Sequence, residues 1–223
     1  MMRSGAVWLL AATLSALVCA GCSDSAADVN SSDAKARKRA IDDLRKRDND
    51  VAAQTLATVT SHDDVNTARE AVRALSRMTA PAAARAMARV AREDKRPEVR
   101  MEAAVGLAYQ PAAEATQALR DMVQSEPDPA VRGAAAASLG RAGAFRDALL
   151  LLAQAEKEQD LAAQTREVAA LEFLVGLRFG FNPKDPPEKR RKAIENIKRM
   201  APMFVKKLET YSPVKKGPIS TGG

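Results

Sequence analysis

The residue types on which most enzymes and metal sites depend are scarce in this chain of 223 residues. It contains one histidine and two cysteines, and aromatic residues make up 4% of the sequence. The single histidine, His62, lies in Ser61-His62-Asp63-Asp64, a polar stretch of the kind that caps the start of a helix. The sequence contains no glycine-rich phosphate loop, metal-ligand cluster or nucleophile elbow. It therefore predicts a protein that is not an enzyme and holds no metal or cofactor.

The scarcity of aromatic residues also bears on nucleic-acid binding, which the net charge of +7 would otherwise suggest. Proteins that bind single-stranded nucleic acid place aromatic rings among their basic residues, and no such platform interleaves the lysines here. Strand patterns are absent as well. We therefore expect an all-α protein with no nucleic-acid partner.

A short apolar segment stands near the start of the chain. Arg3 precedes an uncharged run over residues 6–18, which is too short to span a bilayer and is followed by Cys-Ala-Gly-Cys at residues 19–22. A basic end, an apolar centre and small residues before a cleavage point are typical of a secretory signal. The segment resembles a bacterial lipoprotein signal, with Cys19 standing where that family usually has leucine.

This resemblance implies that residues 1–21 are removed and that Cys22 is lipidated, which leaves the exported protein anchored to a bacterial membrane. Ser23 after the cysteine resembles lipoproteins that face the periplasm from an outer membrane, where one exists. The polar residues 22–32 then form a flexible tether, which at about 3.3 Å per residue reaches roughly 30 Å. Two alternatives stay open, an ordinary secretory signal and an internal hydrophobic helix.

From Asp33 onward the sequence is helical in character. Apolar residues recur at intervals of three and four, and the helix formers Ala, Arg, Glu, Leu and Met predominate. Prolines and polar turns divide this pattern at regular points. The spacing predicts five helix pairs, over residues 33–60, 64–93, 97–125, 128–158 and 160–209. Because one pair cannot bury its apolar faces alone, neighbouring pairs must stack into a continuous core.

The pairs share a sequence frame with a period of 32 residues. Pro97-Glu98-Val99-Arg100 returns as Pro129-Ala130-Val131-Arg132, and each copy continues through an alanine and a leucine. The frame extends backward to earlier leucines and forward, after a step of 34 residues, to Phe173. Its members, to which we assign structural roles, are Leu44, Leu75, Val99, Arg100, Ala103, Leu107, Val131, Arg132, Ala135, Leu139, Arg166, Ala169 and Phe173.

This frame resembles HEAT repeats, particularly the short, phycobilisome-lyase-type HEAT-like repeats. That form carries an acidic residue or proline, then Val-Arg, an alanine three residues on and a leucine four further, as residues 128–140 do. The resemblance implies a right-handed α-solenoid over residues 33–181, built of about five stacked antiparallel helix pairs. Ala68 stands where the family has arginine, so we expect a break there in any series of inter-repeat arginines. The arginines that we expect to reach adjoining repeats are Arg100, Arg132 and Arg166.

Positive charge gathers toward the C-terminal end. Residues 182–223 hold eleven Lys or Arg against four Asp or Glu, whereas residues 22–181 hold 23 against 24. An apolar stripe among these basic residues is typical of an amphipathic helix, so residues 182–210 either cap the last repeat or present a polyanion-binding face. We expect residues 211–223 to be disordered. The candidate polyanion contacts are Lys189, Arg190, Arg191, Lys192, Lys198, Arg199, Lys206 and Lys207.

A repeat scaffold without a chemical site favours a binding function. The sequence predicts a membrane-anchored HEAT-like scaffold that mediates protein–protein interaction in the bacterial cell envelope, with an envelope protein as partner in the concave groove. The alternative is a membrane-surface element that binds anionic lipid or a cell-wall polyanion through its basic C-terminal segment. Fold by itself identifies neither partner.

Overall fold

The computed structural model describes residues 28–111, 113–142 and 145–211. Within these ranges every regular element is a helix, and no strand occurs. The expected signal and its Cys22 lie outside the described residues, as does the expected disordered tail beyond Tyr211. The prediction of an all-α chain is confirmed over the part that the structure describes.

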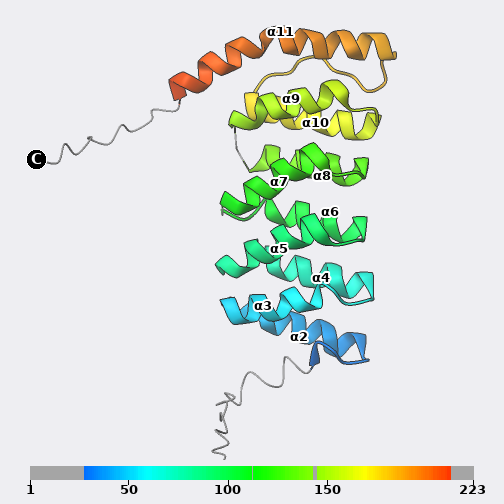
Figure 1. The fold of residues 1–223 in the computed structure, drawn as a ribbon, viewed down its shortest axis with the longest axis vertical. Coiled ribbons are helices and arrows are strands. Elements are labelled where there is room, and N and C mark those ends of the chain that lie inside the picture. The colour runs from blue at the N-terminus through cyan, green and yellow to red at the C-terminus, as the bar shows by residue number, and fades with distance from the viewer. Residues whose placement is uncertain (1–27, 112, 143–144, 212–223) are drawn as a thin grey trace, which may run out of the picture.

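Ten α-helices in the described part form five consecutive pairs (Figure 1). The pairs are α2 (Ala34–Arg47) with α3 (Asp50–Val59), α4 (Val65–Ser76) with α5 (Pro81–Glu93), α6 (Pro97–Leu107) with α7 (Ala113–Ser125), α8 (Pro129–Arg141) with α9 (Ala148–Lys157), and α10 (Leu161–Val175) with α11 (Pro187–Tyr211). A short 3-10 turn, η1 (Phe145–Asp147), precedes α9. Each pair agrees with its predicted segment to within two residues at either end.

Polar side chains set the start of several helices. The residues whose side chains accept a hydrogen bond from a first-turn amide are Asp33, Asn49, Asp64, Asp128 and Asp160. His62 belongs to the turn before α4, where its Nδ1 accepts a hydrogen bond from the Asp64 amide at 3.0 Å. The cap of α4 is therefore Asp64, and His62 supports the turn that presents it.

The pairs stack in order along one axis, so that two layers run the length of the molecule (Figure 1). The first-helix layer contains α2, α4, α6, α8 and α10, each packed on the next. The second-helix layer contains α3, α5, α7, α9 and α11, and α11 crosses the end of the stack against α9. Helices α2 and α11 therefore mark opposite ends of the solenoid.

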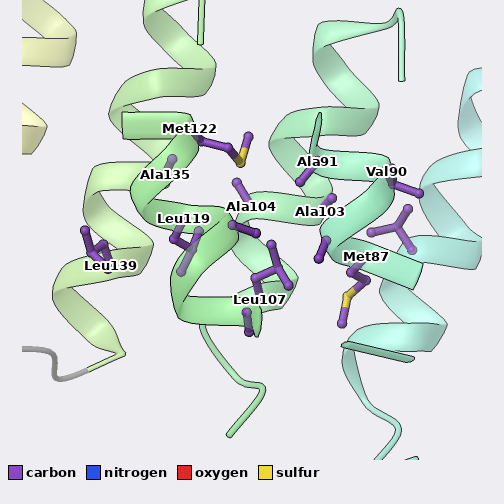
Figure 2. Packing of buried hydrophobic residues seen from close by; sticks show 14 of the residues in the cluster. Met87, Val90, Ala91, Ala103, Ala104, Leu107, Leu119, Met122, Ala135 and Leu139 are labelled. Carbon is purple, nitrogen blue, oxygen red and sulfur yellow. The ribbon is translucent and has the colours of Figure 1, made fainter. Parts of the chain in front are cut away.

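One continuous apolar core lies between the two layers (Figure 2). Leu107 of α6, Leu119 of α7 and Leu139 of α8 are fully buried, and burial of each such side chain stabilises the fold by roughly 2 kcal/mol. Gly140 lets α8 approach α10 closely, because an added Cβ would lie 3.0 Å from the Cβ and 3.3 Å from the carbonyl oxygen of Ala170. The backbone of α8 at Gly140 therefore packs directly against α10.

The repeat frame lies in the core through the fourth pair and differs from expectation in the fifth. The buried members are Leu44, Leu75, Val99, Ala103, Leu107, Val131, Ala135 and Leu139. Phe173 is instead 69% exposed and Ala169 is also exposed, whereas Leu171 is buried. The assignment of Phe173 and Ala169 to the frame is wrong because the 32-residue period continues from Leu139 to Leu171, and the match to Phe173 skipped two residues.

Both ends of the stack extend the core beyond the predicted limits of the solenoid. Val29, expected within the flexible tether, is 2% exposed and packs into the core. At the other end Ile194, Ile197 and Ala201 of α11 are buried as well. The packed part therefore begins before Asp33, and α11 covers the last pair.

Candidate interaction site at the repeat junctions

Arginines reach across the junctions between successive repeats. Arg100 donates from Nε and Nη2 to the Glu126 carboxylate, at 2.9 and 2.6 Å, and from Nη1 to the carbonyl oxygen of Asp94 at 2.9 Å. Arg132, one period later, bonds Glu158 at 2.6 and 2.9 Å and the carbonyl oxygen of Glu126. Each arginine thus ties the loop before its own repeat to the loop before the next. We call this series the arginine ladder.

The acidic partners in the ladder are almost fully shielded from water. The side chains of Glu126 and Glu158 are 4% and 3% exposed. Burial acts to raise the pKa of Glu158, but hydrogen bonds, chiefly from Arg132, outweigh it and hold that pKa below its usual value. Bidentate bonds between charged groups are strong, and removing one partner leaves an uncompensated buried charge. The ladder therefore contributes to how adjoining repeats are held together.

The expected break at Ala68 is present, but another arginine fills it. Ala68 is fully buried and has no side chain that could reach a loop. Arg96 donates from Nη1 to the carbonyl oxygen of His62 at 2.6 Å, and from Nε and Nη2 to the Asp94 carboxylate at 2.9 and 2.7 Å. These are the contacts expected of an arginine at position 68, because His62 and Asp94 precede Asp94 and Glu126 by one period.

Sequence reasoning missed Arg96, although the frame contains the signal. Position 96 belongs to the column of helix-capping residues Asp64, Asp128 and Asp160, which follow one another at the repeat period. Within these four positions arginine replaces aspartate only in the repeat that follows Ala68. The two departures from the frame therefore compensate each other across one junction.

The column of the ladder arginines has different residues near each end of the stack. Arg37 donates from Nη1 to the carbonyl oxygen of Ser31 at 2.7 Å, six residues back, as Arg100 does within its own repeat. In the fifth repeat Gln164 occupies the column and donates to the carbonyl oxygen of Glu158 at 3.4 Å. Arg166 lies outside this column and is exposed, but it reaches the adjoining repeat as expected, because it donates to the carbonyl oxygen of Ala130 in α8 at 3.2 Å.

The core column of Ala103 and Ala135 holds a carboxyl group in the fifth repeat. Glu167 is fully buried, and neither of its oxygens accepts a hydrogen bond from a described donor. Burial, and then the carboxylate of Glu158, raise the pKa of Glu167 to about 8, while Arg132 acts in the opposite direction. A general acid must reach its substrate, and Glu167 is closed off from solvent. This carboxyl group therefore influences stability rather than chemistry at a surface.

A row of shallow clefts, the junction clefts, follows the ladder. They lie between α3 and α5 (about 220 Å³), between α5 and α7 (about 430 Å³), and between the α9–α10 turn and α11 (about 480 Å³). Their acidic ladder residues are Asp94, Glu126 and Glu158. Their basic rim residues, in the same order, are Arg89, Arg92 and Arg191. Small, open clefts of mixed charge suit the side chains of a bound polypeptide better than an enclosed small substrate.

Half of the candidate polyanion contacts already have partners within the fold. Those that bond other residues are Lys189, Arg190, Lys198 and Arg199. Arg191 and Lys192 are exposed and make no hydrogen bond or ion pair with any described residue. The side chains of Lys206 and Lys207 lie outside the described residues. The buried apolar side of α11 and these internal bonds favour its role as a cap.

Two further findings concern the described part alone. No group of three or more His, Cys, Asp or Glu side chains there could hold a metal ion. None of the helices in that part has the length and apolar character needed to cross a bilayer. The chemistry offered along the junction clefts is that of ion pairs and hydrogen bonds.

Comparison with known proteins identifies related sequences and folds. The family model for HEAT repeats matches residues 26–108 and 88–172. The structure of the complex of CpcE and CpcF of phycocyanin lyase from Nostoc sp. PCC7120 is similar, with 20% identity and a TM-score of 0.51. That match covers 68% of this chain and 64% of the other, so this chain spans less than two thirds of its length. At this identity the likeness shows the fold alone.

Two engineered proteins of known structure are also similar to this chain. Their identities are 19% and 20%, and their TM-scores are 0.46 and 0.40. Each match covers 85% of this chain, together with 89% and 90% of the engineered chains. No curated protein sequence matches the chain.

Proposed function

Because this chain belongs to the HEAT-repeat family, we propose that it is a scaffold that binds a partner protein along the junction clefts and catalyses no reaction. The partner is an envelope protein, and the scaffold is held at a bacterial membrane by lipid on Cys22. The observation that carries the proposal is the row of three clefts, each of which offers an acidic ladder residue and a basic rim residue.

Binding along such a row comes from several modest contacts. Adjacent helices in a layer lie about 8–10 Å apart, a spacing that an extended segment or a partner helix can follow. Arg89 makes no hydrogen bond or ion pair with any described residue and is available to an acidic partner group. Arg92 and Asp121 form a pair at 3.2 Å in which both side chains are more than 40% exposed, so exchanging it for an intermolecular pair costs little.

The similar solved structure supports assembly more than chemistry. It is a complex of two proteins, CpcE and CpcF of phycocyanin lyase. Assembly with another protein fits a chain that carries three such clefts along its ladder. Lyase activity is not part of the proposal, because no described hydroxyl group of the clefts donates a hydrogen bond to a carboxylate or imidazole. Those of Thr60 and Ser125 donate to backbone carbonyl oxygens.

The lipid anchor is inferred from the segment at residues 19–22 and is tested separately. Mass spectrometry of the mature protein should find a lipid-modified N-terminal cysteine that begins at residue 22. Cys22→Ser should abolish that modification and release the protein from the membrane fraction. A mature chain that begins elsewhere, or a Cys22→Ser variant that stays membrane-bound, contradicts the anchor.

In-cell proximity crosslinking with mass spectrometry tests the scaffold. The unmodified chain should recover a reproducible envelope partner, and Arg89→Glu should reduce that recovery because it reverses the unpaired charge in the α3–α5 cleft. The matched control is Arg77→Glu, on the first-helix layer and also without a partner among the described residues. Failure of the unmodified chain to capture any partner, or equal losses in both variants, counts against the proposal.

A polyanion-binding function for α11 is the second candidate, favoured by the exposed and unpartnered Arg191 and Lys192. Arg191→Glu with Lys192→Glu should abolish salt-dependent binding to cell-wall polymer under this candidate. Truncation after Phe181 is a poorer test, because it would uncover the face of α9 that Ile194 and Ile197 pack against. Unchanged binding in the double variant removes this candidate.

A further inference from the structure

Helix α2 has the highest proportion of basic residues among the helices of the solenoid. Its 14 residues contain seven Lys or Arg and two Asp. The rest of the solenoid, residues 48–181, contains 16 basic and 19 acidic residues. The solenoid is nearly neutral as a whole, but its α2 end is basic. This end lies opposite the basic helix α11 (Figure 1).

Three basic side chains in the first turns of α2 face solvent, and we call Lys35, Lys38 and Arg39 the N-terminal basic patch. The side chains of Lys35 and Arg39 are exposed and bond no described residue. The side chain of Lys38 is 73% exposed, with a distant ion pair of 3.6 Å to Glu70. The two aspartates of α2 lie further along the helix, where Arg45 and Lys46 pair with them. The patch therefore presents two basic side chains without a partner among the described residues, and a third with an ion pair of 3.6 Å to Glu70.

The structure also determines where the chain joins this patch. Val29 is buried in the core, and Arg37 binds the carbonyl oxygens of Ser31 and Ser32 at 2.7 and 3.1 Å. The chain is therefore fixed at the α2 end, and only seven peptide steps separate Val29 from Cys22. At about 3.3–3.6 Å per step, they span at most roughly 25 Å.

We propose that the N-terminal basic patch docks on the anionic headgroups of the membrane that holds the lipid on Cys22, so that the solenoid stands on its α2 end. This inference rests on the proposed anchor. The lipid holds the chain at the bilayer, and a basic surface within reach of it adds electrostatic attraction to anionic headgroups. Each basic residue held near an anionic surface multiplies binding about fivefold.

This orientation separates the two basic ends of the molecule. Four spacings of about 10 Å between stacked helices place α10 roughly 40 Å from α2, and α11 lies beyond it. With α2 on the bilayer, α11 is several Debye lengths from the same headgroups, and the junction clefts stay open to a partner. Charge reversal in α2 should therefore weaken vesicle binding more than charge reversal in α11.

Vesicle flotation of residues 22–223 carrying Cys22→Ser isolates the electrostatic contribution, since the buried core begins at Val29. The vesicles are phosphatidylcholine with and without phosphatidylglycerol. We expect binding only with phosphatidylglycerol, and Lys35→Glu with Arg39→Glu should weaken it by about tenfold or more. The matched control, Arg191→Glu with Lys192→Glu, should change it by about twofold at most. All four side chains are exposed, and unchanged circular dichroism checks the fold.

Three outcomes would overturn the proposal: no binding to either vesicle, equal binding by the α2 variant and the parent chain, or a larger loss in the α11 variant. The anchor is assessed independently by flotation of the membrane-extracted protein with pure phosphatidylcholine. If that protein fails to float while the Cys22→Ser chain still binds phosphatidylglycerol through the patch, the anchor fails and the docking surface stands. If it floats but the α2 variant binds phosphatidylglycerol normally, the anchor stands and the docking surface fails.

Discussion

The fourth and fifth repeats hold different residues in the same columns of the frame. In the fourth repeat Arg132 continues the ladder and Ala135 fills the core column. In the fifth, those columns hold Gln164 and Glu167. Each column keeps its place in the fold, but Gln164 has no later ladder loop to reach. The repeat geometry sets where a residue lies, and the presence of a following repeat sets which chemistry it needs.

Breaking the arginine ladder should have the largest effect on stability. Arg132→Ala leaves Glu158, whose side chain is 3% exposed, as an unpaired carboxylate, so the free energy of unfolding should fall by about 3–5 kcal/mol. Urea denaturation followed by circular dichroism measures the loss. Arg178→Ala removes a pair whose arginine is 90% exposed and should cost less than about 1 kcal/mol. Equal costs in the two variants would contradict the role given to the ladder.

Removing the buried acid of the last junction should have the next largest effect, with opposite sign. The folded pKa of Glu167, about 8, lies above the ordinary 4.5, so the folded state holds this proton more tightly than the unfolded chain. Stability is therefore greatest below the lower value and is lost as pH rises through the higher one. Glu167→Gln should remove this decline and stabilise the protein by about 2–3 kcal/mol near pH 8. The gain is smaller than the decline itself, because the buried amide of the glutamine has no hydrogen-bond partner.

Thermal unfolding near pH 5 and near pH 8 measures this change. The matched control is Glu172→Gln on the same helix, where the carboxylate accepts bonds from Arg178 and the Phe179 amide. It should not flatten the decline with pH. Parallel pH profiles for the unmodified chain and Glu167→Gln would show that Glu167 is not protonated preferentially in the folded state.

At the junction where Arg96 compensates for Ala68, exchanging both residues should restore the stability that the first change removes. Arg96→Asp removes the bonds to His62 and Asp94 and brings a second carboxylate close to Asp94, at a cost of about 2–3 kcal/mol. Adding Ala68→Arg should recover most of that loss, because positions 68 and 96 then hold the same residues as Arg100 and Asp128 one period later. The double-mutant coupling energy measures the recovery. Additive effects would contradict the compensation.

Extending the ladder into the fifth repeat should have the smallest effect. Gln164→Arg restores the frame residue, but Glu158 is already bonded by Arg132 and no later ladder loop supplies another acid. The free energy of unfolding should therefore change by less than about 0.5 kcal/mol. A gain comparable to the loss in Arg132→Ala would show that an arginine in this column is stabilising even without a later repeat.

Periodicity predicted the helix pairs and the core columns, because these features depend on residues within one repeat. It failed at Phe173, which was chosen by residue type although it lies 34 residues after Leu139. The buried residue is Leu171, which lies 32 residues after Leu139. The contribution of Arg96 was missed because it depends on Ala68 in the preceding repeat, and no single repeat contains both. The burial of Val29 was missed for a related reason, since a short polar stretch gives no periodic signal.

The ladder also bears on the order in which the protein folds. Its bonds across junctions join residues 26 to 36 positions apart, and none requires a residue from beyond the adjoining repeat. Short separations between contacting residues favour rapid folding, and a stack whose repeats contact only their neighbours can grow from one end. The early repeats can therefore reach their final packing before the later ones fold, with each new loop acid closing the junction behind it.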